Sequence, residues 1–225
     1  MIVCNSHAKV GYRQAILKPE DPRSSGFLFF VEPDVPNWPA SCRLTRGASI
    51  PSVTKGYAET LAVIAARSER RAVRASLVLD TLFRRLAASR FITEADAAEE
   101  AIWTVWMHHP HRSAAETIEL ATSDIAARRY DIAETRLTLL TRRSPDFSEA
   151  WHKRATLYYL LGEDGACVRD LHRALVLEPR HFAAILHFAE ILLGADRKAD
   201  ARFAFAAALS LHPHLSRARQ ALSEP

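Results

Sequence analysis

Histidine is the residue type whose chemistry and spacing first point to a site in this chain. There are ten histidines, nine of them after residue 107. The imidazole ring binds zinc, nickel and copper. Five of these histidines lie in two groups, one around Pro110 and one around Pro213. Neither group has the His-x3-His spacing of a helical metal site. Both lie at predicted helix ends, where histidine suits the negative end of the helix dipole. The sequence therefore predicts no metal site and no cofactor. The two groups are His108, His109 and His111 around Pro110, and His212 and His214 around Pro213.

The residue patterns of common enzyme classes are absent from the sequence. The chain has no glycine-rich phosphate loop, no nucleophile elbow and no His-Glu-x-x-His pattern. Glu149, His152 and Glu190 can face one another across a helical groove, but such grooves ordinarily contain a few ionisable groups. We therefore predict no catalytic residues and a protein that is not an enzyme.

Charge and composition argue against a nucleic-acid-binding, membrane-bound or disulfide-rich protein. The net charge is +4 and the pI about 9.1, but acidic residues are interleaved with the arginines, so a solvated helical surface is favoured over a nucleic-acid or membrane-surface contact. No run of about 18 apolar residues predicts a membrane span. No secretory signal is readable, so the chain as written is expected in the cytoplasm. Three scattered cysteines do not form a disulfide framework.

A period of 34 residues organises the second half of the chain. Pro145, Pro179 and Pro213 lie at this interval, and so do Ala121, Ala155 and Ala189. Thirty-four residues is the period of the tetratricopeptide repeat, a helix–turn–helix unit that buries its apolar faces by stacking on its neighbours. The predicted fold class is all-α: a right-handed α-solenoid of about three helix pairs, preceded by two or three capping helices.

The residues within the period resemble the tetratricopeptide family. The middle repeat reads SEAWHKRATLYYLLGEDGACVRDLHRALVLEPRH. Its match to the family pattern is strong, that of the third repeat is good, and that of the first is weaker. Over residues 79–210 the chain is similar to a bacterial group that reads Ala-Trp-Asn-Lys-Arg-Ala-Thr and later Leu-Glu-Pro-Arg-His-Phe. His152 stands where that group has asparagine. The resemblance implies a small scaffold with about three repeats and no established activity, and some relatives look exported.

The chain divides near residue 55. Six of eleven prolines and four of seven glycines precede residue 57, and this stretch lacks helical periodicity. We predict an irregular, disordered extension over 1–55, since the one segment with strand character, 27–31, has no partner strand and an isolated strand is not stable. The alternative is translation from a later, non-methionine start. Residues 56–112 should be capping helices on the first repeat. Residues 113–225 should hold repeats 114–147, 148–181 and 182–215 and a short C-terminal cap.

The family pattern also separates core positions from binding positions. It assigns to the core Trp151, Tyr158, Leu171, Ala174, Phe188 and Phe205. By alignment with the family, other positions of the first helices should project into a concave groove. Such a mixture of apolar and polar groups suits an extended peptide or an amphipathic helix. The predicted peptide-binding residues are His152, Lys153, Thr156, Tyr159, Leu186, His187 and Glu190.

These residues predict a non-catalytic scaffold for protein–protein interaction, with a protein or peptide partner that the sequence does not identify. The groove lacks the Lys/Asn/Arg arrangement of the family members that grip chaperone C-termini. An alternative is a self-assembling structural module that forms a homo-oligomer through an apolar end. A metal-binding or nucleic-acid-associated protein has less support.

Overall fold

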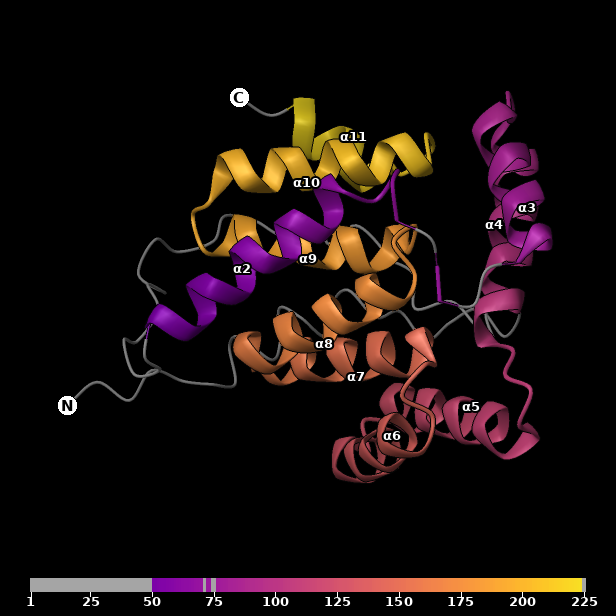
Figure 1. The fold of residues 1–225 in the computed structure, drawn as a ribbon, viewed down its shortest axis with the longest axis vertical. Helices are drawn as coiled ribbons and strands as arrows, with labels where there is room; N and C mark the ends of the chain where they lie inside the picture. Colours follow the sequence, from indigo (N-terminus) through magenta and orange to yellow (C-terminus); the bar gives the residue numbers. More distant parts are fainter. Residues whose placement is uncertain (1–49, 71, 74–75, 224–225) are drawn as a thin grey trace.

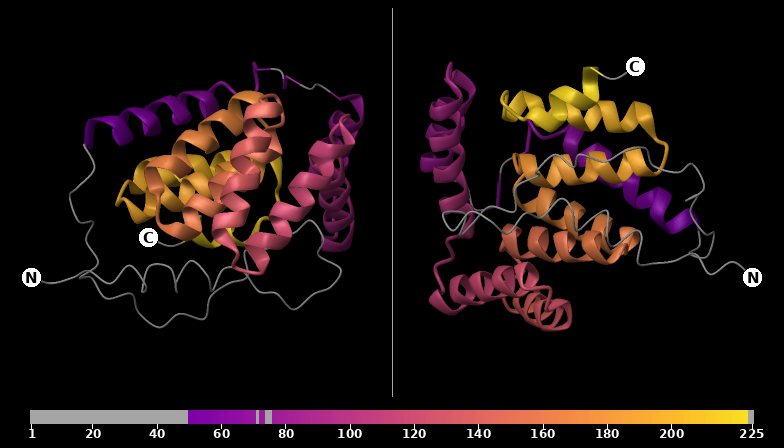
Figure 2. Two further views of the ribbon diagram at one scale, coloured as in Figure 1. Left: turned by 90° about the horizontal axis from the view of Figure 1, so that it is seen from below. Right: turned by 180° about the vertical axis from the view of Figure 1, so that it is seen from behind.

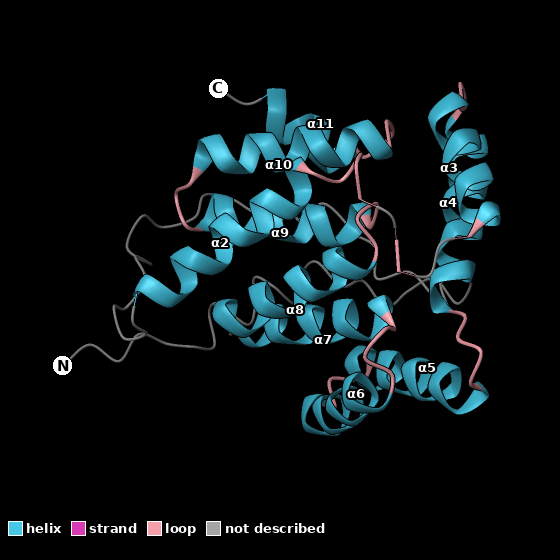
Figure 3. Cartoon of the chain, in the orientation of Figure 1, coloured by secondary structure: helices cyan, strands magenta, loops and turns pink. Residues whose placement is uncertain are grey.

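The computed structural model describes residues 50–70, 72–73 and 76–223, and within them all regular secondary structure is helical (Figure 1, Figure 3). The predicted all-α class is confirmed for this part of the chain. The segment 27–31, considered above as an isolated strand, lies outside the described residues. The helices are α2 (Ile50–Ala65), α3 (Leu77–Ala88), α4 (Ile92–Met107), α5 (Arg112–Ala126), α6 (Tyr130–Arg143), α7 (Ser148–Leu161), α8 (Asp164–Leu177), α9 (Phe182–Gly194), α10 (Lys198–Leu211) and α11 (Ser216–Ser223).

The 34-residue period sets the helix boundaries. The helices α6, α8 and α10 begin at residues 130, 164 and 198 and end at residues 143, 177 and 211. Each ends two residues before one of the periodic prolines, which cannot continue a helix. The pairs α5–α6, α7–α8 and α9–α10 follow one another along the chain, and each packs on the next. This neighbour-to-neighbour stack is the predicted α-solenoid.

The turn inside each pair uses a left-handed residue at the same point of the period. Arg128, Gly162 and Asp196 have φ angles of 58°, 81° and 59°. Only glycine adopts this conformation without a steric cost from Cβ. The first and third turns are therefore strained at Arg128 and Asp196, whereas the middle turn is not.

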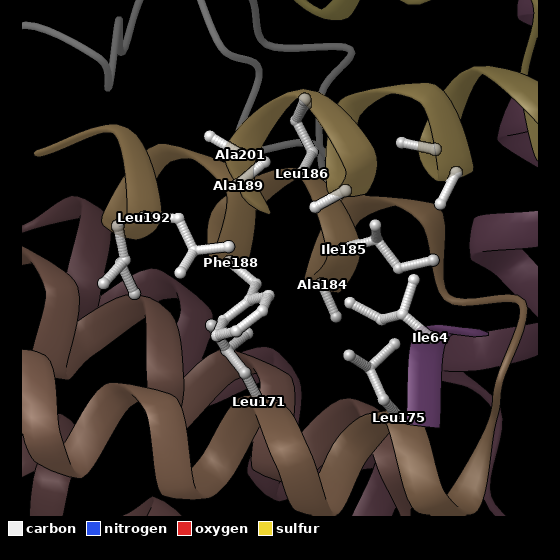
Figure 4. Close-up of a cluster of buried hydrophobic side chains, with 14 of the residues drawn as sticks. Ile64, Leu171, Leu175, Ala184, Ile185, Leu186, Phe188, Ala189, Leu192 and Ala201 are labelled. Atoms are coloured by element: carbon white, nitrogen blue, oxygen red, sulfur yellow. The ribbon is translucent and has the colours of Figure 1, made fainter. Parts of the chain in front are cut away.

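Small residues allow the helices to approach closely, as the repeat pattern predicts. Ala121, Ala155, Ala189 and Cys167 are all fully buried. The helix α2 adds to this core by packing against α8 and α10. In Figure 4, Ile64 of α2 lies among side chains of α8 and α9. Because α2 begins at Ile50, residues 50–55 are helical, and the predicted irregular boundary at residue 55 is wrong there.

The hairpin of α3 and α4 runs along one edge of the stack, beside the loops that join the pairs (Figure 1, Figure 2). Met107, near the first pair, packs against that pair's core, and Trp106 contacts the loop before α9. Glu99 Oε2 lies 2.8 Å from His212 Nε2, in the loop after α10. Residues 56–112 thus brace the edge and back of the stack instead of capping its first pair, because the large aromatic side chains of α4 find partners in these loops.

Four of the six predicted core residues, namely Leu171, Ala174, Phe188 and Phe205, are buried. Trp151 and Tyr158 are only half-buried, which corrects the prediction for both. Trp151 Nε1 donates to the carbonyl oxygen of Pro145 at 3.1 Å, and the Tyr158 hydroxyl donates to Glu134 Oε1 at 3.2 Å. Both rings keep their polar atoms bonded at the surface, as amphipathic aromatic residues usually do.

Candidate functional site: a buried cluster of histidines, glutamate and lysine

The seven predicted binding residues lie on α7 and α9, and we call them the α7–α9 strip. The ring of His187 lies 5.2 Å from that of His152 and is stacked on that of Tyr159 at 5.7 Å, so residues from two successive pairs meet. Six of the seven are buried, and Glu190 is half-buried. Glu190 accepts two hydrogen bonds from Arg217 of α11, at 2.6 and 3.1 Å.

The burial of the two adjacent tyrosines, Tyr158 and Tyr159, is the reverse of that predicted. Tyr159 is 7% exposed, whereas Tyr158 is half-buried and faces α6 through Glu134. The prediction that Tyr159 is the exposed member is wrong for this structure. Tyr159 shares its face of α7 with His152 and Thr156, seven and three residues before it, and all three side chains are buried.

Glu149 is the centre of a cluster at the start of α7, and its side chain is 0% exposed. One carboxylate oxygen, Oε1, lies 3.3 Å from His152 Nδ1 and 3.3 Å from Lys153 Nζ. The other, Oε2, lies 2.7 Å from His181 Nε2. Glu149, His152 and Lys153 meet because residues three and four apart share one face of a helix. His181 comes from the loop that begins the next pair.

The partners of His181 fix the protonation of its ring. Nδ1 accepts from the backbone N–H of Ala184 at 3.3 Å, which makes His181 the side-chain cap of α9. A neutral imidazole that accepts at one nitrogen carries its proton on the other, so Nε2 donates to Glu149. The same contact therefore caps one helix and joins it to the preceding pair.

Two tryptophans of α4 enclose this cluster. The Trp106 ring stacks on the His181 ring with centroids 4.2 Å apart and an angle of 15°. The Trp103 ring meets that of Trp106 edge-on at 5.3 Å. Lys153 Nζ lies 5.2 Å from the centre of the Trp103 ring, within the range of a cation–π contact. The α4 helix thus closes the end of the strip that holds His152 and Lys153.

Burial and the neighbouring charges set the ionisation of the cluster. Burial alone raises the pKa of Glu149, but His152, Lys153 and the hydrogen bond from His181 outweigh it and hold the pKa well below its ordinary value. Burial lowers the pKa of His152 from 6.5 to about 4, although Glu149 opposes this. Burial also holds the pKa of His187 well below 6.5. At neutral pH, Glu149 is therefore an anion paired with Lys153 beside neutral rings.

One group in the described part of the chain has metal-ligand spacing. The ligand atoms of Glu149, His152 and His181 all lie within 4.8 Å of one another. The sequence prediction missed this group because it considered histidines that are adjacent in the chain. The available signal was Glu-x-x-His at the start of α7 together with His181, which occupies the repeat position of the apolar residues Phe147 and Leu215.

The histidines that flank proline have another role. His109 Nδ1 accepts from the backbone N–H of His111, and His212 Nδ1 accepts from that of His214, at 3.1 and 3.2 Å. Glu178, 34 residues before His212, holds its own turn in the same way, through the N–H of Arg180. These side chains stabilise the turns around the prolines.

No described helix has the length and apolar character needed to cross a membrane.

No family model matches the chain. The chain is 30% identical over 114 residues to a TPR repeat-containing protein of Rhizobium etli. The matched part is 51% of this chain and 56% of that relative, so it spans little more than half of the relative's length. The similarity and the stacked helix pairs confirm the resemblance to tetratricopeptide proteins. Stacked repeats of this kind generally present binding surfaces, which indicates a module for protein–protein interaction.

Proposed function

We propose that this chain is a non-catalytic interaction module that binds an extended peptide or an amphipathic helix along α5, α7 and α9. The observation that carries the proposal is the contact between His152, His187 and Tyr159, which forms one continuous strip from two successive pairs. Aromatic and imidazole rings with a polar edge offer a large contact area and hydrogen bonds to a bound segment.

The burial of the strip affects how such binding would proceed. Trp103 covers the end with Lys153, and Tyr159, Leu186 and His187 are also buried. A partner must therefore bind a form in which these side chains are accessible. Its apparent affinity is then reduced by the fraction of molecules in that form.

The test is capture of a partner from the source cells, followed by binding measurements on variants. Tyr159→Ala and Glu190→Ala should each weaken the binding by about 1–3 kcal/mol, the scale of a useful interface residue. Arg169→Ala is the matched control, because Arg169 is exposed on α8. Circular dichroism must show that each variant is folded. Normal binding by both strip variants, with loss of binding in a variant on α8, would place the interface elsewhere.

A specific observation favours self-assembly as a second function. Leu120, Ile132 and Leu139 of the first pair are 52%, 46% and 45% exposed. In the later pairs, the positions equivalent to Leu120 contact the preceding pair. Arg154 donates to Thr141 of α6 at 3.0 Å, and Phe188 is buried in the shared core. An apolar residue at this position on the first pair can dock another copy of the chain. Light scattering should then show an oligomer that Leu120→Glu dissociates, and a monomer at all concentrations would exclude it.

A further inference from the structure

We propose that Glu149, His152 and His181 form a binding site for a divalent transition metal ion of the zinc class. Two imidazole rings and one carboxylate are donors that suit zinc, nickel and copper. Their ligand atoms lie within 4.8 Å of one another. In a tetrahedral site with bonds of about 2.0–2.2 Å, the ligand atoms are roughly 3.3–3.6 Å apart, so modest side-chain movement brings the three into range.

The position of the three donors is fixed by the fold. Glu149 and His152 project from one face in the first turns of α7, and His181 is held at the start of α9 by the stacked ring of Trp106. All three side chains are buried. Rigid elements that hold ligands in advance reduce the ordering that an ion must impose.

An unpartnered nitrogen of His152 is the strongest support for the metal site. If its Nδ1 donates to Glu149, its Nε2 keeps a lone pair, and this atom is buried with no hydrogen-bond partner among the described residues. A buried polar atom without a partner is uncommon and calls for an explanation. The neutral form of the ring, which burial favours, is also the form that binds a metal ion.

The ion must compete with a lysine and with a proton. Lys153 Nζ lies 3.3 Å from Glu149 Oε1, where its ammonium group already balances the carboxylate. Coordination by Nε2 of His181 requires the proton on this nitrogen to move to Nδ1 of the same ring, which breaks the cap on the backbone N–H of Ala184. Because Lys153 competes with the ion for the carboxylate, metal affinity should rise when the charge of Lys153 is removed.

The experiment uses the full chain without a histidine tag, freed of metals by a chelator. Zn2+ is titrated by calorimetry, and Co2+ by its visible absorption. We expect one ion per chain, with quenching of tryptophan fluorescence by Co2+ because Trp106 stacks on a ligand ring. Failure of the wild-type protein to bind one ion saturably would overturn the proposal whatever the variants do.

Three variants separate this site from incidental histidine binding. His152→Asn should weaken binding at least about tenfold, since metal sites lose affinity on this scale even when only supporting contacts are removed. His172→Asn is the control, because His172 is half-buried on α8 and lies outside the group. Lys153→Met should tighten binding. Equal affinity of the wild type and His152→Asn, with circular dichroism showing both folded, would also refute the site.

Discussion

Glu149→Gln removes a buried charge and nearly preserves the shape of the side chain. The glutamate is fully buried and faces Lys153 Nζ at 3.3 Å, so the substitution leaves an ammonium group buried without its anion. Removing one partner of a buried ion pair typically costs about 3–5 kcal/mol. We expect a decrease of about 3–5 kcal/mol in the free energy of unfolding.

The assay is urea unfolding of four proteins in a double-mutant cycle: wild type, Glu149→Gln, Lys153→Met and the double variant. The double variant buries no unpaired charge at these two positions and should recover most of the stability lost by Glu149→Gln. The stability regained by the double variant measures the cost of the unpaired ammonium group, and the part not regained includes the loss of the hydrogen bond to His181. A loss below about 1 kcal/mol in the single variant, or strictly additive effects, would refute the account of a charge-balanced cluster.

The remaining predictions concern the turns, the response to acid, the core and α2. Arg128→Gly should raise the free energy of unfolding by about 0.5–1 kcal/mol, because relief of left-handed strain exceeds the added freedom of the unfolded chain; urea unfolding that shows a loss would contradict the strain. The pKa of His152 in the folded protein is lowered to about 4, so between pH 6.5 and 4 the unfolded chain binds more protons than the folded one. Stability should therefore fall as the pH is lowered through that window. Glu149, whose pKa is also lowered by folding, adds to the loss as the pH falls below 4.5. Thermal melts in which His152→Asn loses less stability on acidification than the wild type would support this, and identical pH profiles of the two proteins would contradict it. Ala155→Leu should destabilise by about 1–3 kcal/mol through overpacking of a fully buried position, and an unmoved urea midpoint would contradict the packing. Removing residues 1–65 deletes α2 and should lower the melting temperature, whereas removing 1–49 alone should leave it nearly unchanged.

The repeat geometry could be predicted because it depends on local and periodic signals. Pro145, Pro179 and Pro213 end their helices, and alanines such as Ala155 and Ala189 mark the close contacts. The same 34-residue rule identified the helix pairs and their turns. Such signals act within one repeat or between neighbouring repeats, so they survive in the sequence as a pattern.

The arrangement of α4 and the buried cluster could not be read in this way. Trp103 and Trp106 lie about 75 residues before His181, and no period links them. The reversal of Tyr158 and Tyr159 has a related cause, since the family pattern assigns faces of a helix but does not say what covers each face. The sequence signals for the cluster were the Glu-x-x-His spacing at the start of α7 and a histidine, His181, in a repeat position where Phe147 and Leu215 are apolar.

Hydrogen exchange with and without a captured partner shows whether the α7–α9 strip is the interaction surface. The partner should slow exchange in 152–160 of α7 and 183–193 of α9 and leave the exposed segments of α8 around Arg169 and Arg173 unchanged. Protection confined to α6, α8 or α10, with α7 and α9 unaffected, would contradict the account and place the interaction surface on the second helices of the pairs.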